Sequence, residues 1–130
     1  MADIWKSILS NGQAFAIVSS TELLTIAAAA SSDTVLTVPA NAILLGVSVR
    51  VTVAIPTAAT FTVTTEIGGT TLNTAVVSTA ADSTDPGTAA GTSYRSAATK
   101  IRITPNLTPA NTDGRVRVTV WYLVSTPPTS

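Results

Sequence analysis

The feature that most constrains this chain is a strict alternation between valine and polar residues over positions 47–53. The valines occupy the odd positions and are separated by Ser48, Arg50 and Thr52. Successive side chains of a β-strand point to opposite faces, so this period of two indicates a strand with one buried and one solvated face. A second run of the same kind, 115–123, lies close to the C-terminus. The two runs predict a β-sheet protein in which the valines point inward and Arg50 points outward.

Further strands are predicted by short runs of Val, Ile, Phe and Thr that are bounded by turn residues. We expect strands at 13–19, 22–27, 34–38, 43–55, 60–67, 70–77, 94–98, 100–104 and 115–124. The long strand should carry a bulge at Gly46, and Gly68-Gly69 indicates a hairpin turn. The predicted fold class is all-β: an antiparallel β-sandwich, jelly-roll-like, with a short N-terminal arm or helix. The inward-facing set is expected to be Val47, Val49, Val51, Val53, Phe61, Val63, Ile101, Ile103, Val116, Val118 and Val120.

The N-terminal residues differ from the rest of the chain. Asp3 is a suitable N-cap for a short helix that carries Ile4, Trp5, Ile8 and Leu9. Two helical turns are not stable alone, so this segment must dock on something. Two interpretations stay open: it covers one end of its own sandwich, or it packs on a neighbouring subunit. The chain of 130 residues is expected to comprise an arm at 1–13, a β-sandwich at 14–124 and a C-terminal tail at 125–130.

The composition argues against several classes of function. The formal net charge is zero, which removes the electrostatic basis for nucleic acid or an anionic membrane as the main partner. The longest apolar runs are too short to span a bilayer, and the N-terminus lacks the pattern of a secretory signal. Only 11% of the residues are charged, so a subunit whose surface is partly covered in an assembly is one interpretation. An alanine-rich free surface is the other.

No part of the sequence indicates catalysis or cofactor binding. There is no histidine to act as a general base near neutral pH and no cysteine nucleophile. Asp82 and Asp85 are close enough in sequence to contact Ca²⁺, but two carboxylates without the rest of a binding loop are more simply solvated loop acids. We therefore expect no catalytic residue, no metal site and no cofactor, and we expect that the protein is not an enzyme.

The basic residues indicate a candidate interface, because five of the seven Lys and Arg residues lie after position 94. If the two arginine-bearing strands near the C-terminus form a hairpin, Arg102 stands opposite Arg117 or Arg115. Like charges directly opposite each other are destabilising, so a carboxylate should lie between them. Glu66, Asp113 or a neighbouring subunit would supply it; the alternative is that the arginines splay apart into water. The candidate interface residues are Ile4, Trp5, Ile8, Leu9, Arg102, Arg115 and Arg117.

Three blocks of the sequence carry distinctive strand motifs. The first block, 38–52, contains Leu-Gly-Val-Ser followed by Arg-Val-Thr. The second, 97–104, reads Ala-Ala-Thr-Lys-Ile-Arg-Ile-Thr, and the third, 114–123, opens with Gly-Arg-Val-Arg-Val. These blocks resemble a module known from tailed-bacteriophage virion proteins, and the resemblance covers roughly residues 35–124 as scattered blocks. The segment 64–85 departs from the family pattern, because it is rich in Thr, Ala and Ser where relatives carry an aromatic, Asp- and Gly-rich loop.

The resemblance implies a non-enzymatic component of a phage particle, located in the virion and assembled in the host cytoplasm. Our first interpretation is a capsid decoration, or cement, protein: a small homo-oligomer, with a trimer favoured, that binds the major capsid protein or another virion protein. The alternative is a receptor- or glycan-binding module of a tail or head fibre, for which Tyr94 and Trp121 are the candidate exposed aromatic residues. A small hydrolase is disfavoured because no base–nucleophile pair is present.

Overall fold

A computed structural model of the protein describes residues 3–8, 14–77, 84–85 and 93–126, and it describes side chains over 15–73 and 94–124. Within these residues there are ten strands and no helix. The strands are β1 (Asp3–Ile8), β2 (Ala14–Thr25), β3 (Ser32–Val38), β4 (Ala42–Val53), β5 (Thr60–Thr65), β6 (Thr71–Val77), β7 (Thr84–Asp85), β8 (Ser93–Arg95), β9 (Thr99–Pro105) and β10 (Arg115–Thr126).

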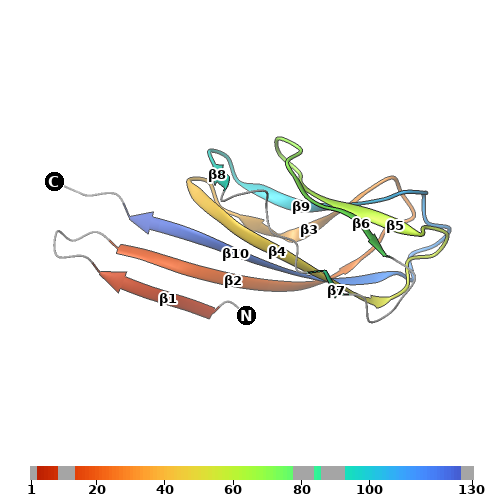
Figure 1. Cartoon of the computed structure of the whole chain (residues 1–130), viewed down its shortest axis with the longest axis horizontal. Helices are drawn as coiled ribbons and strands as arrows, with labels where there is room; N and C mark the ends of the chain where they lie inside the picture. Colours follow the sequence, from red (N-terminus) through yellow and green to blue (C-terminus); the bar gives the residue numbers. More distant parts are fainter. Residues whose placement is uncertain (1–2, 9–13, 78–83, 86–92, 127–130) are drawn as a thin grey trace.

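The strands form two antiparallel sheets that face each other (Figure 1). The larger sheet has six strands in the order β1-β2-β10-β4-β7, with β8 also paired to β4, and the smaller sheet has the order β3-β9-β5-β6. The all-β sandwich predicted from the alternating valines is confirmed. The hairpin turn predicted at Gly68-Gly69 joins β5 to β6, and both glycines have positive φ, of 83° and 59°, which favours glycine there.

Register decides which side chains of β4 reach the core. The pairing of β4 with β10 skips Leu45, directly before Gly46, which is where the sequence predicted a bulge. The skipped residue changes the inward positions from the even-numbered Ala42 and Leu44 to the odd-numbered valines at 47, 49 and 51. The alternation read from the sequence is therefore correct from Val47 to Val51.

Val53 is the residue of the predicted inward set that the structure places outside. The register passes from Val51 opposite Val116 to Val53 opposite Arg115, which leaves Thr52 without an opposite residue. One skipped residue exchanges the two faces of a strand, so the side chain of Val53 is 46% exposed. The prediction for Val53 was wrong because the alternation within one strand does not reveal a second bulge.

The other predicted inward residues are buried and belong to one hydrophobic core between the two sheets. Phe61, Ile26 and Leu44 are among its largest side chains. Buried threonines are hydrogen-bonded; Thr34 Oγ1, for example, accepts a hydrogen bond from the backbone N–H of Ile101 at 3.1 Å. Among the described residues, no buried side-chain nitrogen or oxygen lacks a hydrogen-bond partner, which is typical of a well-packed interior.

The N-terminal segment is a strand where a short helix was expected. β1 pairs antiparallel with β2 and places Ile4 opposite Val18 and Trp5 opposite Ile17. An isolated helix of two turns has too few hydrogen bonds to persist, whereas the edge of β2 offers partners to the backbone along the whole segment. The helix prediction was wrong over these residues, and Leu9 lies outside the described part of the chain.

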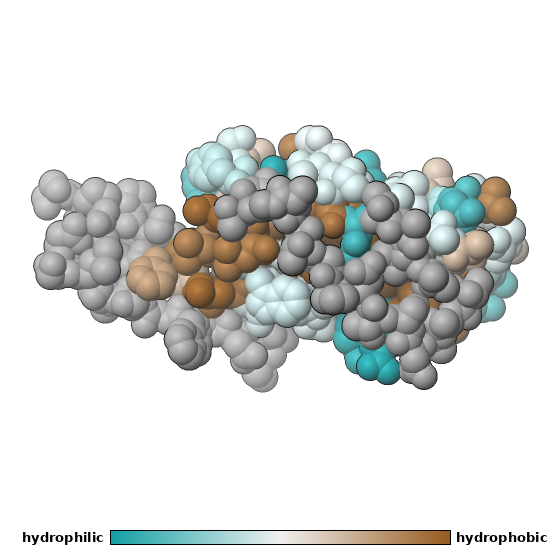
Figure 2. Space-filling view, viewed as in Figure 1, coloured by the Kyte–Doolittle hydropathy of each residue, from teal (hydrophilic) through white to brown (hydrophobic). Residues whose placement is uncertain are grey.

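The strands expected at 13–19 and 22–27 are one continuous strand, β2. The polar residues Ser19, Ser20 and Thr21 stay in register with β10 and do not form a turn. With β1 and the end of β10, the start of β2 extends beyond the smaller sheet (Figure 1). Figure 2 shows hydrophobic atoms gathered where this extension leaves the sandwich, and Tyr122 and Val124 pack there against the core.

Glu22 connects the two sheets. Its carboxylate accepts hydrogen bonds from the backbone N–H of Val35, at 2.9 and 3.0 Å from its two oxygens, and from the N–H of Leu36 at 2.8 Å. β3 departs from regular pairing with β9 between Asp33 and Thr37, so the carboxylate accepts hydrogen bonds from backbone N–H groups where regular strand pairing is interrupted. A charged side chain therefore takes the place of a strand partner for these N–H groups.

Candidate functional site

The predicted hairpin between the two arginine-bearing strands does not form. β9, which carries Arg102, lies between β3 and β5 in the smaller sheet, whereas β10, which carries Arg115 and Arg117, lies between β2 and β4 in the larger sheet. The prediction that Arg102 stands opposite Arg115 or Arg117 was therefore wrong. Two strands that each bury one face show the same alternation of apolar and polar residues whether they pair in one sheet or lie in two facing sheets. The sequence pattern of these strands therefore could not distinguish the two arrangements.

Arg102 pairs with a carboxylate that the sequence did not single out for it. Arg102 Nε and Nη2 donate to Asp33 Oδ1 and Oδ2 at 2.7 and 2.8 Å, and the two residues are direct register partners on β9 and β3. Asp33 therefore takes the place predicted for Glu66 or Asp113. The hydrogen bonds from Arg102 hold the pKa of the Asp33 carboxyl below its usual range, and partial desolvation acts in the opposite direction.

Arg115 and Arg117 do share one surface, the outer face of the six-stranded sheet. We call it the arginine–apolar face, because its row along β10 runs from these two arginines through Thr119 to Trp121 and Leu123. Residues directly opposite each other in a sheet project from the same face. Register therefore adds apolar and basic neighbours from β2 and β4, namely Phe15, Ile17, Leu23, Ile43, Arg50 and Val53. It also adds Ser19, Thr21, Thr25, Gly46 and Ser48, which lie mainly beside the middle of the row.

Several apolar side chains of this face are exposed. Phe15, at 37%, and Ile17 and Trp121, both at 38%, lie toward the end of β10, whereas Leu23, at 51%, stands opposite Arg117. Ile17 stands opposite Leu123, so the apolar side chains are neighbours across β2 and β10. Exposed apolar residues that stand singly are ordinary, but a contiguous group on a sheet face points to an interaction surface.

The outer face of the four-stranded sheet has a different character, and we call it the threonine face. Its members by strand alternation are Asp33, Thr37, Thr60, Thr62, Thr64, Glu66, Lys100, Arg102 and Thr104. The charges balance here, with two acids and two bases. Val35, on the irregular part of β3, is its exposed large apolar residue, at 83% exposure.

The remaining predicted interface residues lie on β1. Ile4, Trp5 and Ile8 stand opposite Val18, Ile17 and Ala14 at the edge of the six-stranded sheet. Because Trp5 stands opposite Ile17, its register position lies on the arginine–apolar face beside Ile17. The structure brings β1, Arg115 and Arg117 onto one sheet and places Arg102 on the other.

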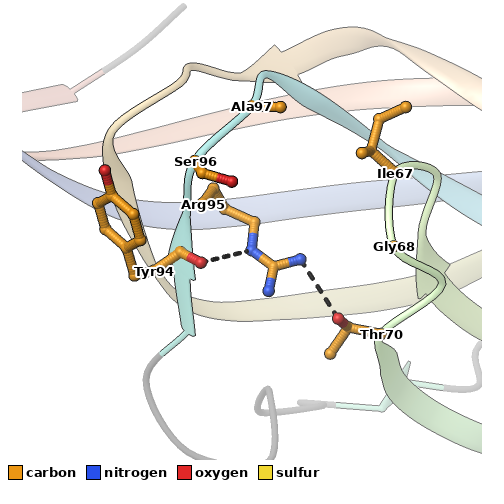
Figure 3. Close-up of a pocket in the computed structure, with 7 residues that line it drawn as sticks. All are labelled: Ile67, Gly68, Thr70, Tyr94, Arg95, Ser96 and Ala97. Atoms are coloured by element: carbon orange, nitrogen blue, oxygen red, sulfur yellow. Dashed lines mark hydrogen bonds between the residues drawn. The ribbon is translucent and has the colours of Figure 1, made fainter.

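A small pocket lies between β8 and the turn that joins β5 to β6 (Figure 3). Its volume is about 190 Å³. Its lining comprises Ile67, Gly68, Thr70, Tyr94, Arg95, Ser96 and Ala97. A cavity of this size suits one side chain or one sugar unit and is smaller than a pocket for a drug-sized ligand.

Arg95 and Tyr94 give the pocket its chemistry. Arg95 donates from Nε to the carbonyl oxygen of Tyr94 at 3.2 Å and from Nη1 to the hydroxyls of Thr70 and Thr65 at 3.3 and 3.4 Å (Figure 3). Tyr94 is exposed and donates from its hydroxyl to Asn41 Oδ1 at 2.7 Å. A cation, a ring and hydroxyls together suit a small hydroxylated or anionic group. Tyr94 was noticed in the sequence, whereas the role of Arg95 depends on how β8 pairs with β4.

Metal binding and membrane spanning find no support in the described parts of the chain. Across those residues, no group of three or more His, Cys, Asp or Glu is placed to hold a metal ion. No helix there is long and apolar enough to cross a bilayer. Asp82 lies outside the described residues, so the possible Ca²⁺ contact with Asp85 is not tested.

Comparison with known proteins identifies the class of the fold. No protein-family model and no curated protein matches the chain. Among solved structures, a chain of the cyanophage Pam1 capsid asymmetric unit matches with a TM-score of 0.58 and 26% identity, over 86% of this chain and 84% of that one. A chain of the acid-stable capsid structure of Helicobacter pylori bacteriophage KHP30 matches with a TM-score of 0.56 over 98% and 99% of the two chains.

The second likeness, at 14% identity, shows the fold alone, whereas the first also shares sequence. The resemblance to phage virion structural modules that the three sequence blocks predicted is confirmed. The likeness to phage capsid structures supports a virion structural protein.

Proposed function

We propose that this protein is a capsid decoration, or cement, protein that binds the outside of a phage head and stabilises it. The observation that carries the proposal is the likeness to a chain of the Pam1 capsid asymmetric unit, which extends over most of both chains. The exposed apolar residues of the six-stranded sheet add support, because a surface subunit needs one face to seat on the shell.

The decorating unit is a homo-oligomer, and we favour a trimer. A closed cyclic assembly covers sheet edges, such as that of β1, which otherwise invite uncontrolled pairing. Light scattering at micromolar concentration should give the mass of three chains of 13.2 kDa each. A monomer whose stability is unchanged on dilution would contradict the oligomer.

The partner is the major capsid protein or another virion protein, and the protein resides in the virion after assembly in the host cytoplasm. In this proposal residues 14–124 form the body, residues 1–13 form an arm that docks on a neighbour, and residues 125–130 form a tail. No catalytic residue, metal or cofactor takes part. Stabilisation comes from the added contacts between shell subunits, since a ligand that binds only the assembled state stabilises it by mass action.

The direct test uses phage heads that lack the protein. Purified protein is added, and binding is followed by co-sedimentation while DNA release on heating reports head stability. We expect saturable binding at a fixed ratio to the major capsid protein and a higher temperature of DNA release. Absence of binding, or binding without any change in DNA release, would contradict the cement function.

A second candidate function, a receptor- or glycan-binding module of a fibre, is favoured by the pocket at Tyr94 and Arg95. Aromatic rings and hydrogen-bonding groups around a small hollow are suited to a sugar. In this alternative, labelled protein should bind host cells without heads present. Tyr94→Ala should abolish cell binding and Trp121→Ala, an aromatic change on a different surface, should leave it intact.

A further inference from the structure

The two outer faces of the sandwich differ in both charge and hydrophobicity. The threonine face combines Asp33 and Glu66 with Lys100 and Arg102, so it carries no excess charge. The arginine–apolar face carries Arg50, Arg115 and Arg117 at one end, and register adds one acid, Asp3, opposite Ser19 toward the other end. Among the residues placed on the two faces, the arginine–apolar face therefore has the excess of positive charge.

The positive end of the arginine–apolar face can accept carboxylates of a partner. Arg117 on β10 and Arg50 on β4 stand opposite each other there, and Arg115 lies on the same face of β10. Arg117 is exposed, so a carboxylate of a partner can reach its guanidinium and form a bidentate pair. Arginine is also the basic residue that protein interfaces favour.

The apolar end lies beyond a polar row in which Thr119 stands between Thr21 and Ser48. Trp121 and Leu123 follow this row along β10, and Phe15 and Ile17 lie beside that end on β2. Residues at the centre of protein interfaces are enriched in aromatic side chains and arginine, and a few such residues dominate the binding free energy. One sheet face thus carries both an apolar part and a basic part, as protein interfaces do.

A second copy of this chain is a poor occupant for the face. A twofold pairing brings the same patch of each copy together, so both copies would bring the same excess of positive charge to the interface. The threonine face of a neighbouring copy offers no excess of carboxylates. Charge complementarity therefore favours a different protein, one whose surface is acidic beside an apolar patch.

We propose that the arginine–apolar face is the surface that seats on the phage shell, and that the shell surface it meets is acidic beside an apolar patch. This inference rests on the proposed decoration function and names the face and the partner chemistry for it. The threonine face then points away from the shell, into the medium.

The test compares matched substitutions on the two faces, using the full-length protein and heads that lack it. Arg117→Glu is matched by Lys100→Glu, and Trp121→Ser is matched by Val35→Ser. We expect the first member of each pair to weaken head binding by about tenfold or more, since tenfold corresponds to about 1.4 kcal/mol and hot-spot truncations cost about 2 kcal/mol or more. The second members should stay close to wild type. Wild-type binding should also fall with salt more steeply than binding of Arg117→Glu.

The possible outcomes distinguish a failure of this inference from a failure of the proposed decoration function. If wild-type protein does not bind heads, the decoration function fails and the inference fails with it. If wild-type protein binds and the substitutions on the threonine face are the damaging ones, or all four variants bind equally, the inference alone is overturned. Thermal unfolding of each variant checks the fold, and Arg117→Lys, which keeps the charge but not the bidentate geometry, should lose less binding than Arg117→Glu.

Discussion

Asp33 and Arg102 form a bidentate ion pair on the threonine face, and it makes stability depend on pH. The pKa of Asp33 is lowered in the folded protein by the hydrogen bonds from Arg102. The unfolded value is about 3.9, so the stabilisation is complete above about pH 4 to 5 and is lost as pH falls through the lower folded-state pKa. Asp33→Asn should therefore reduce the free energy of unfolding near neutral pH and make little difference in strong acid.

Denaturant unfolding of wild type and Asp33→Asn across this pH range measures the effect, at one protein concentration because the protein is proposed to be an oligomer. In an Arg102→Gln background the same substitution should lose most of its pH dependence. A constant difference between wild type and Asp33→Asn at every pH would show that the ion pair is not its source.

Val51 and Val53 test the register of β4 at the level of single residues. Val51 is fully buried and Val53 is 46% exposed, although simple alternation assigns both to the core. Val51→Thr buries a hydroxyl group and should cost about 1–3 kcal/mol in the free energy of unfolding. Val53→Thr should change it by no more than about 0.5 kcal/mol, as surface substitutions do. Equal costs for the two variants would contradict the bulge at Thr52.

At the scale of the elements, Glu22 holds β2 and β3 together across the two sheets. Glu22→Ala removes the acceptor for the N–H groups of Val35 and Leu36 and should destabilise the protein by about 1–3 kcal/mol. Glu22→Gln keeps one oxygen acceptor and should cost less. Hydrogen exchange of the Val35 and Leu36 amides should accelerate in the alanine variant, whereas the amide of Ile101, deeper in the core, should stay protected. Unchanged exchange at both amides would contradict this role.

β1 is the element whose removal the sandwich should tolerate. It lies at the edge of the six-stranded sheet, and β2 keeps β10 on its other side when β1 is absent. Deleting residues 2–12 should leave a folded protein by circular dichroism, with weakened assembly or weakened attachment to heads. If the truncated protein unfolds, the segment belongs to the fold itself. If it decorates heads as well as the full chain does, residues 1–13 are not a docking arm.

These elements show what could be predicted from the sequence. The inward valines of β4 and β10 were predictable because alternation is a local property of a strand. The outward position of Val53 was not predictable, because the face it occupies depends on a skipped residue in the pairing with β10. The ion-pair partner of Arg102 was not predictable either, because Asp33 lies 69 positions away in the sequence and meets Arg102 through strand pairing.

The candidate interface was predictable in part. Arg115 and Arg117 share a face because both occupy alternate positions of one strand, and their spacing shows this. The neighbouring Phe15, Ile17 and Leu23 belong to the same face through the pairing of β2 with β10, which spans most of the chain. Sequence spacing alone does not contain that pairing.

At the scale of the whole molecule, we propose that this sandwich decorates the outside of a phage head. The most direct measurement is a cryo-electron microscopy reconstruction of heads that lack the protein, before and after its addition. We expect added density at symmetry-related sites on the outer surface, into which the β-sandwich fits with the six-stranded sheet facing the shell. Heads without added density, together with density for the sandwich in a tail or fibre of the complete virion, would contradict it.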